Sequence, residues 1–168
     1  MYTNRPRLKV PLMPIDLILI ALTITGIIYM FVSTYIYYPH LAETIPTHFN
    51  AKGEVDAYGK TINIWIIPFL ALLISALLFI LNRFPHFHNY MLNITEENAL
   101  KNYRFSTRVV RYINFFVMLL LLYIQYVMLQ AGMGKETSIG SWLLPIVISS
   151  SILLPIVLII QLMRINKK

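Results

Sequence analysis

The residues that could do chemistry gather in a polar stretch between two long apolar runs. His40, His48 and Asp56 follow one another there at intervals of eight positions, and two imidazoles with one carboxylate form a ligand set that suits zinc. No helical or hairpin geometry brings these three positions together by itself. The spacing therefore favours a structural interpretation, in which His48 donates a hydrogen bond inside the stretch, over a metal centre.

Two short repeats lie in the same stretch. Asn50 precedes Gly53 by three positions, and Asp56 precedes Gly59 by the same interval. Asn or Asp at the first position and Gly at the fourth favour a type I turn, because the side chain bonds the backbone ahead of it. Two such turns in succession predict a compact, ordered loop.

Polar side chains inside the apolar runs are a second group of candidates. Asp16 lies two residues after Pro14, and a carboxylate in a first helical turn is favoured as a cap for unpaired N–H groups over a proton relay. Asn63, Asn114 and Gln125 favour hydrogen bonds between helices. The alternative for these polar residues is a path through a small transporter or transporter subunit, which four spans would form only as a homo-oligomer.

Signatures of familiar enzymes do not occur. The sequence has no His-Glu-x-x-His, no Gly-x-Ser-x-Gly and no phosphate-binding glycine loop. It also has no cysteine, which excludes disulfides, thiolate metal sites and a cysteine nucleophile. His86 and His88 are expected to be solvated at a membrane edge. An enzyme is therefore disfavoured and no cofactor is expected, with a metal-dependent membrane enzyme built on the three candidate ligands as an alternative.

The composition indicates which elements must position these groups. Apolar residues make up 58% of the 168 positions and charged residues 12%, which lies outside the usual range of soluble proteins. A helix needs about 17–25 apolar residues to cross a hydrocarbon core of about 30 Å. Four runs meet this requirement, at residues 15–37, 62–81, 112–130 and 142–163. We therefore expect an all-α membrane protein of four transmembrane helices, folded as a single domain over residues 1–168.

The distribution of basic residues predicts the orientation in the bilayer. Eleven Lys and Arg residues lie in the two termini and the loop at residues 82–111, whereas three lie in the other two loops. By the positive-inside rule, both termini are cytoplasmic and the loop at residues 38–61 is extracytoplasmic. The formal net charge of +7 follows the ends of the apolar runs and forms no continuous stripe, so the lipid bilayer is the expected partner and nucleic acid is not.

The cytoplasmic loop at residues 82–111 is predicted to contain a short helix. Asparagine, threonine and glutamate near Thr95 suit a helix start, and the helix should continue into the third span. Arg104, Arg108 and Arg111 then share one face, since they lie at i, i+4 and i+7. This basic face is predicted to lie against anionic lipid head groups.

The outer loop resembles a known family. Its motif is a Pro-x-His-Phe core followed by spaced polar and glycine residues, namely Pro46, His48, Phe49, Asn50, Gly53, Asp56 and Gly59. This motif after a first membrane helix resembles the bacterial domain-of-unknown-function family 1648, and the string from Ile94 to Ala99 is similar to small stand-alone members. The same domain forms the N-terminal part of SdpI-type immunity proteins. The resemblance implies a bacterial plasma-membrane protein and assigns no chemistry to the motif residues.

These observations lead to an expected function. An ordered outer loop without a catalytic set favours a non-enzymatic binding, immunity or envelope-signalling module. Such a module would present residues 41–60 to an external peptide or small ligand. The transporter and the metal-dependent enzyme remain the alternatives.

Overall fold

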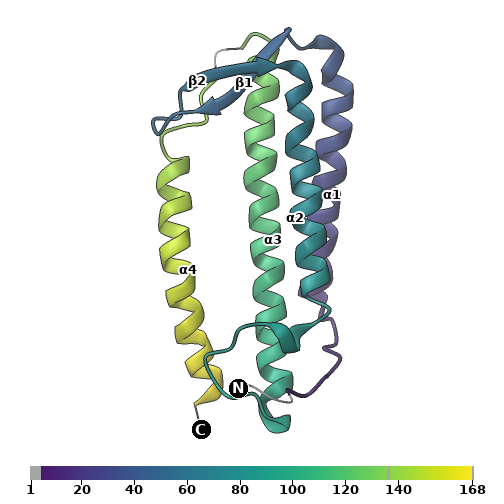
Figure 1. The fold of residues 1–168 in the computed structure, drawn as a ribbon, viewed down its shortest axis with the longest axis vertical. Coiled ribbons are helices and arrows are strands. Elements are labelled where there is room, and N and C mark those ends of the chain that lie inside the picture. The colour runs from purple at the N-terminus through teal and green to yellow at the C-terminus, as the bar shows by residue number, and fades with distance from the viewer. Residues whose placement is uncertain (1–4, 136, 168) are drawn as a thin grey trace.

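The computed structural model of the chain describes residues 5–135 and 137–167. It is mostly helical, with one two-stranded sheet at one end (Figure 1). The elements in chain order are α1 (Pro14–Tyr37), the 3₁₀ turn η1 (Tyr38–His40), β1 (Thr44–Phe49), β2 (Val55–Lys60), the 3₁₀ turn η2 (Thr61–Trp65), α2 (Ile66–Leu81), the 3₁₀ turn η3 (Pro85–Phe87), α3 (Glu96–Gly132) and α4 (Leu143–Asn166). Four helices are long and apolar enough to cross a membrane. The second of these spans consists of η2 and α2 together. The expected architecture of a multi-pass membrane protein is confirmed.

Helices α1, α2 and α3 form a bundle, and α4 stands beside it (Figure 1). Ile27, Met30, Ala71 and Met118, contributed by the three bundled helices, pack together in the interior. Gly26 lets α1 approach α3 closely, because a Cβ at this position would overlap the side chain of Met118. Small residues serve this purpose in membrane helix pairs, where close backbone packing replaces a hydrophobic driving force.

Helix α4 is attached to the bundle at its two ends. None of its residues is buried. Near its C-terminal end, Lys101 donates to the carbonyl of Ile165 at 3.0 Å, and the amides of Asn102 and Asn166 exchange hydrogen bonds of 3.1 and 2.8 Å. Its N-terminal end follows a segment that contacts the hairpin. Between these attachments Phe116 and Leu119 of α3 face α4 and are still 39% and 42% exposed.

Helix α3 joins the predicted loop helix to the third span without a break. It begins after Thr95, whose N–H donates to Asn98 Oδ1 at 3.0 Å, with Glu96 and Glu97 in the first turn. These acids suit the positive end of the helix dipole. At 37 residues the helix is about 55 Å long, well beyond the hydrocarbon core of about 30 Å. Its N-terminal part therefore extends out of the membrane, as expected.

The outer loop is folded as a β-hairpin that lies across the ends of the helices (Figure 1). Strands β1 and β2 pair antiparallel. The turn predicted at Asn50–Gly53 connects the two strands and is confirmed by a hydrogen bond from Gly53 N to Asn50 O of 2.9 Å. The turn predicted at Asp56–Gly59 is wrong, because both residues lie inside β2. Gly59 pairs with Ile45 of β1, and Asp56 lies at an irregularity within the same strand, so neither residue bounds a turn.

Candidate functional site

The hairpin is fixed by a pair of motif side chains. His48 Nδ1 lies 2.5 Å from Asp56 Oδ1, and the two side chains are 68% and 41% exposed. The strand register pairs His48 with Ala57 and Phe49 with Val55, so Asp56 has no partner across the ladder. Such a bulge re-aims a side chain, and here it sets the carboxylate beside the imidazole. The hydrogen bond predicted for His48 is present.

Asn50 holds the turn in shape. Its Oδ1 accepts hydrogen bonds from the backbone N–H groups of Lys52 and Glu54 at 2.8 and 3.1 Å. Its Nδ2 donates to the carboxylate of Glu54 at 2.9 Å. The side-chain amide of Asn50 thus takes part in three hydrogen bonds, which give the turn a defined structure, as the Asn-x-x-Gly spacing predicted.

Gly53 attaches the hairpin to the segment that leads into α4. Its carbonyl accepts hydrogen bonds from Ile139 N at 3.0 Å and from Ser138 Oγ at 2.6 Å. It has a φ of +82°, and a Cβ here would lie 2.7 Å from the backbone of Gly140. Gly53 is therefore required by both its backbone conformation and the contact it makes. The motif glycine thus joins the hairpin to the fourth helix.

A cavity lies below this part of the hairpin. Its volume is about 520 Å³. The hairpin contributes one wall and α3, α4 and the segment before α4 contribute the others. The lining residues are Thr47, His48, Phe49, Asn50, Ala51, Gly53, Ile124, Ile139, Gly140, Leu143, Leu144 and Val147. Four motif residues thus line a mostly apolar space with polar side chains at its hairpin side.

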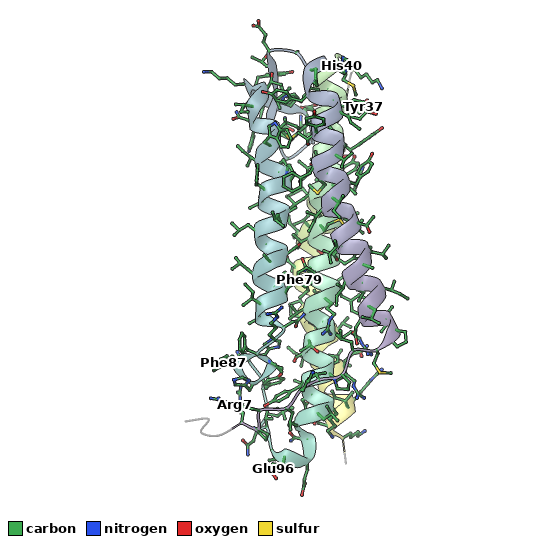
Figure 2. All side chains as sticks on the ribbon, turned by 90° about the vertical axis from the view of Figure 1, so that its right-hand side faces the viewer. Arg7, Tyr37, His40, Phe79, Phe87 and Glu96 are labelled. Carbon is green, nitrogen blue, oxygen red and sulfur yellow. The ribbon has the colours of Figure 1, made fainter. Side chains whose placement is uncertain are left out.

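The candidate metal set of His40, His48 and Asp56 is not formed in the part of the chain that the structure describes. His40 ends η1 next to α1 (Figure 2), and it does not join the pair of His48 and Asp56. Within residues 5–135 and 137–167 no three histidine, aspartate or glutamate side chains gather closely enough to hold a metal ion. The hairpin contact uses Asp56 to hold His48, as the structural interpretation of the spacing expected.

The predicted basic face points inward instead of toward lipid head groups. Arg108 Nε and Arg111 Nη1 lie 3.1 and 3.3 Å from Asp16 Oδ1. Asp16 and Arg111 are buried, and the Nε atom of Arg104 is buried as well. The prediction of a membrane-surface face is therefore wrong for Arg108 and Arg111. Their acidic partner lies on α1, 92 positions away from Arg108.

The capping role predicted for Asp16 is confirmed alongside this ion pairing. Its Oδ2 accepts a hydrogen bond from the backbone N–H of Met13 at 2.9 Å. One carboxylate therefore starts α1 and also ties it to α3. The contact with α3 was not predicted from the sequence.

The polar residues within the spans bond between helices, as predicted for two of them. Ser75 donates to Asn114 Oδ1 at 2.7 Å, which joins α2 to α3. Gln125 Nε2 donates to the carbonyl of Met30 at 2.9 Å and to Ser33 Oγ at 3.0 Å, which joins α3 to α1. Asn63, for which the same kind of bond was predicted, lies in η2, before α2 begins.

A second polar cluster occupies the loop at the other end of the bundle. His88 is buried, with ring nitrogens 3.1 Å from Ser106 Oγ and 3.1 Å from the carbonyl of Leu81. Burial lowers the pKa of His88 below its ordinary value of 6.5, so the ring is neutral at neutral pH and can accept from Ser106. Burial also raises the pKa of Tyr90, whose hydroxyl lies 2.7 Å from Ser106 Oγ, to about 12. The expectation of a solvated His88 is wrong, because the loop folds over it.

Comparisons with known proteins agree with the motif. Residues 18–72 match the family model described as a domain of unknown function, DUF1648. An uncharacterised protein of Archaeoglobus fulgidus is 31% identical over 102 residues, which cover 56% of this chain and 56% of that relative. The chain thus matches little more than half the length of the relative. No solved structure matches the chain. The family match spans most of α1, the whole hairpin and part of α2, and it confirms that residues 18–72 resemble the DUF1648 family.

Proposed function

We propose that this protein is a non-enzymatic binding module of the plasma membrane that takes an external peptide or small amphipathic ligand at its hairpin. The excess of basic residues in both termini and in the loop at residues 82–111 supports a hairpin that faces outward. An outward hairpin is the part of the protein that a molecule arriving from outside would meet first. Immunity and envelope signalling are the cellular roles that such a module would serve.

The observation that carries the proposal is the cavity of about 520 Å³ under the hairpin. Ligand sites are typically concave, mostly apolar and furnished with a few placed polar groups. Here Ile124, Leu143 and Val147 supply apolar walls, and His48 and Asn50 supply polar groups at the hairpin side. This arrangement suits a ligand with an apolar group that enters the cavity and a polar end that remains at the hairpin.

The rigid shape of the hairpin supports the same function. The contact of His48 with Asp56, the amide of Asn50 and the attachment at Gly53 hold the cavity wall in one conformation. A wall that is already ordered loses little conformational entropy when a ligand binds. The motif residues therefore act through the surface that they shape, and no covalent chemistry is required of them.

Two variants test this proposal: one fills the cavity and the other removes a polar side chain from its hairpin side. Cells that produce Val147→Trp or His48→Ala should become more sensitive to a panel of membrane-active cationic peptides than cells that produce the wild type. We expect at least one inhibitory concentration to fall about tenfold, the effect of losing about 1.4 kcal/mol of binding. Immunoblots of membrane fractions check that each variant is inserted at wild-type abundance.

Ile148→Trp is the matched control for the filled cavity. Ile148 is the next residue of α4, is 50% exposed and does not line the cavity. Its variant should protect cells as the wild type does. The proposal is contradicted if Val147→Trp and His48→Ala behave as the wild type against every peptide, or if producing the wild type gives no protection.

A further inference from the structure

A groove runs between α3 and α4 from the end of the bundle opposite the hairpin. It consists of two cavities with volumes of about 490 and 460 Å³. Val109 of α3 and Leu158 of α4 line both cavities, so the two spaces adjoin at these residues. The lining residues of α3 extend from Phe105 to Leu119, which is about 21 Å along the helix axis. The groove therefore has the elongated shape that suits a chain.

The cavity nearer the middle of the helices presents almost only carbon. Its walls are formed by aliphatic and aromatic side chains such as Ile113, Phe116 and Leu154. The two serines that line it, Ser150 and Ser151, donate their hydroxyls to carbonyls of their own helix at 3.0 and 2.7 Å. Because these hydroxyls are already paired, the cavity suits a hydrocarbon occupant.

The polar side chains of the second cavity are paired with one another. His88 contacts Ser106 and the carbonyl of Leu81, and Ser106 also contacts the hydroxyl of Tyr90. The rest of this lining is mostly apolar. The second cavity therefore continues the apolar path of the first.

Apolar side chains of the loop before α3 remain exposed at this second cavity. Phe87 and Met91 line it and are 70% and 74% exposed, and Figure 2 shows Phe87 near the end of the bundle opposite His40. Exposed apolar side chains that gather at a groove indicate a surface that another molecule covers.

The end of the bundle at which the groove begins is basic. Both termini lie at this end (Figure 1). Residues 5–16, 82–111 and 164–167 contain ten of the 14 Lys and Arg residues but three of the seven acids. One of these acids, Asp16, is already paired with Arg108 and Arg111. This excess of positive charge is complementary to an anionic lipid head group.

Lys101 supplies a positive charge just beyond the groove. It precedes Phe105 by about one helical turn, and its ammonium donates to the carbonyl of Ile165 at 3.0 Å, about one turn beyond Leu162. Phe105 and Leu162 both line the groove. An ammonium has three N–H donors, so Lys101 can hold this carbonyl and bind a phosphate oxygen at the same time.

We propose that the groove between α3 and α4 holds a hydrocarbon chain of an anionic phospholipid, with the lipid phosphate paired to Lys101. The lipid comes from the leaflet at the end opposite the hairpin. Its chain enters sideways between two membrane-spanning helices, so the lipid binds without leaving the membrane. This site is separate from the cavity under the hairpin and does not depend on the proposed function.

Native mass spectrometry of the purified, delipidated protein in detergent tests the proposal by titration with two lipids. Phosphatidylglycerol and phosphatidylcholine with the same acyl chains both have a phosphate, but the choline cation cancels its charge. We expect phosphatidylglycerol to bind about fivefold more tightly, the contribution of one lysine beside an anionic head group. Lys101→Gln should bring phosphatidylglycerol to the level of phosphatidylcholine, whereas Lys101→Arg should keep the preference.

Leu158→Trp tests the groove itself, because it fills the place where the two cavities adjoin. It should weaken both lipids about tenfold. Leu153→Trp is the matched control, since Leu153 is 58% exposed on the same helix and lines neither cavity. It should bind both lipids as the wild type does. Lys101→Gln leaves the cavities unaltered, so the test does not depend on the folding of Leu158→Trp.

Four outcomes would overturn the proposal. Equal binding of the two lipids by the wild type would exclude the anionic head group, and unchanged binding by Leu158→Trp would exclude the groove. Palmitate that bound as tightly as phosphatidylglycerol would exclude the pairing of a phosphate with Lys101. A dimer that formed without lipid and excluded phosphatidylglycerol would assign the groove to a second copy of the chain.

Discussion

Replacing Asp16 with alanine is expected to lower the free energy of unfolding by about 3–5 kcal/mol. The buried carboxylate pairs with Arg108 and Arg111, and it also accepts from the backbone of Met13. Its removal leaves Arg111, only 7% exposed, without its acidic partner. Reversible unfolding of the purified protein in mixed micelles measures this loss.

Two further variants separate the ion pair from the helix cap. Asp16→Asn keeps an acceptor for Met13 but removes the charge, so it should lose nearly as much stability as Asp16→Ala. Adding Arg111→Leu to Asp16→Asn should restore part of the loss, because the unpaired charge is then removed. If Asp16→Asn were as stable as the wild type, the carboxylate would serve as a cap alone.

Replacing Gly53 with alanine is expected to detach the hairpin from the segment before α4. The left-handed conformation costs about 1–2 kcal/mol for a residue with a Cβ, and the added methyl would lie 2.7–2.8 Å from backbone atoms of Gly140. The N–H of Ile139, which donates to the Gly53 carbonyl, should then exchange with solvent faster. Hydrogen exchange of the wild type and variant in the same detergent measures this change.

Gly134→Ala isolates the conformational cost. Gly134 has a φ of +80°, nearly that of Gly53, but a Cβ there would meet no atom within 4 Å. This variant should lose stability from strain alone and leave exchange at Ile139 unchanged. Equal effects of the two variants on Ile139 would show that the contact with Gly140 does not hold the hairpin.

The spans and the hairpin turn could be predicted from the sequence because both depend on local patterns. A helix that crosses lipid must satisfy its own backbone, so length and apolarity suffice to locate it. The turn at Asn50 and Gly53 also has a local cause, since one side chain bonds the next backbone groups. The match of residues 18–72 to the DUF1648 family includes the loop motif on which the resemblance was based.

The strands of the hairpin were less predictable. Strand β1 contains Pro46, which cannot donate to a ladder and argues against a strand, and Asp56 and Gly59 in β2 suit a turn equally well. The pairing of β1 with β2 makes both segments strands, and this pairing cannot be derived from either segment alone. The bulge at Asp56 follows from that pairing, so its contact with His48 could be expected only as an unspecified hydrogen bond.

The inward direction of the basic face could not be derived from helical spacing. Arginines at i, i+4 and i+7 share a face whether that face meets head groups or another helix. The lone acid in the first turn of the first span was the available signal, since an intramembrane carboxylate requires a partner. The positions of Asp16 and Arg108 are 92 residues apart, and only the packing of α1 on α3 brings them together.

The cavity under the hairpin likewise depends on tertiary structure. The walls formed by Ile139 and Gly140 belong to a segment that carries no motif, and its place under the hairpin follows from the hydrogen bonds to Gly53. Gln125 was correctly predicted to bond between helices. That bond fixes the amide and leaves its oxygen unpaired, which the sequence alone does not show.

The proposed function requires a hairpin that faces outward, and single-cysteine labelling tests this orientation most directly. The wild type has no cysteine, so Lys52→Cys in the hairpin turn and Met91→Cys at the opposite end each give one reactive thiol. Both positions are exposed. In intact cells, a membrane-impermeant maleimide should label Lys52→Cys, and it should label Met91→Cys only after permeabilisation. Labelling of Met91→Cys but not Lys52→Cys in intact cells would show that the hairpin faces the cytoplasm and would contradict the proposed orientation.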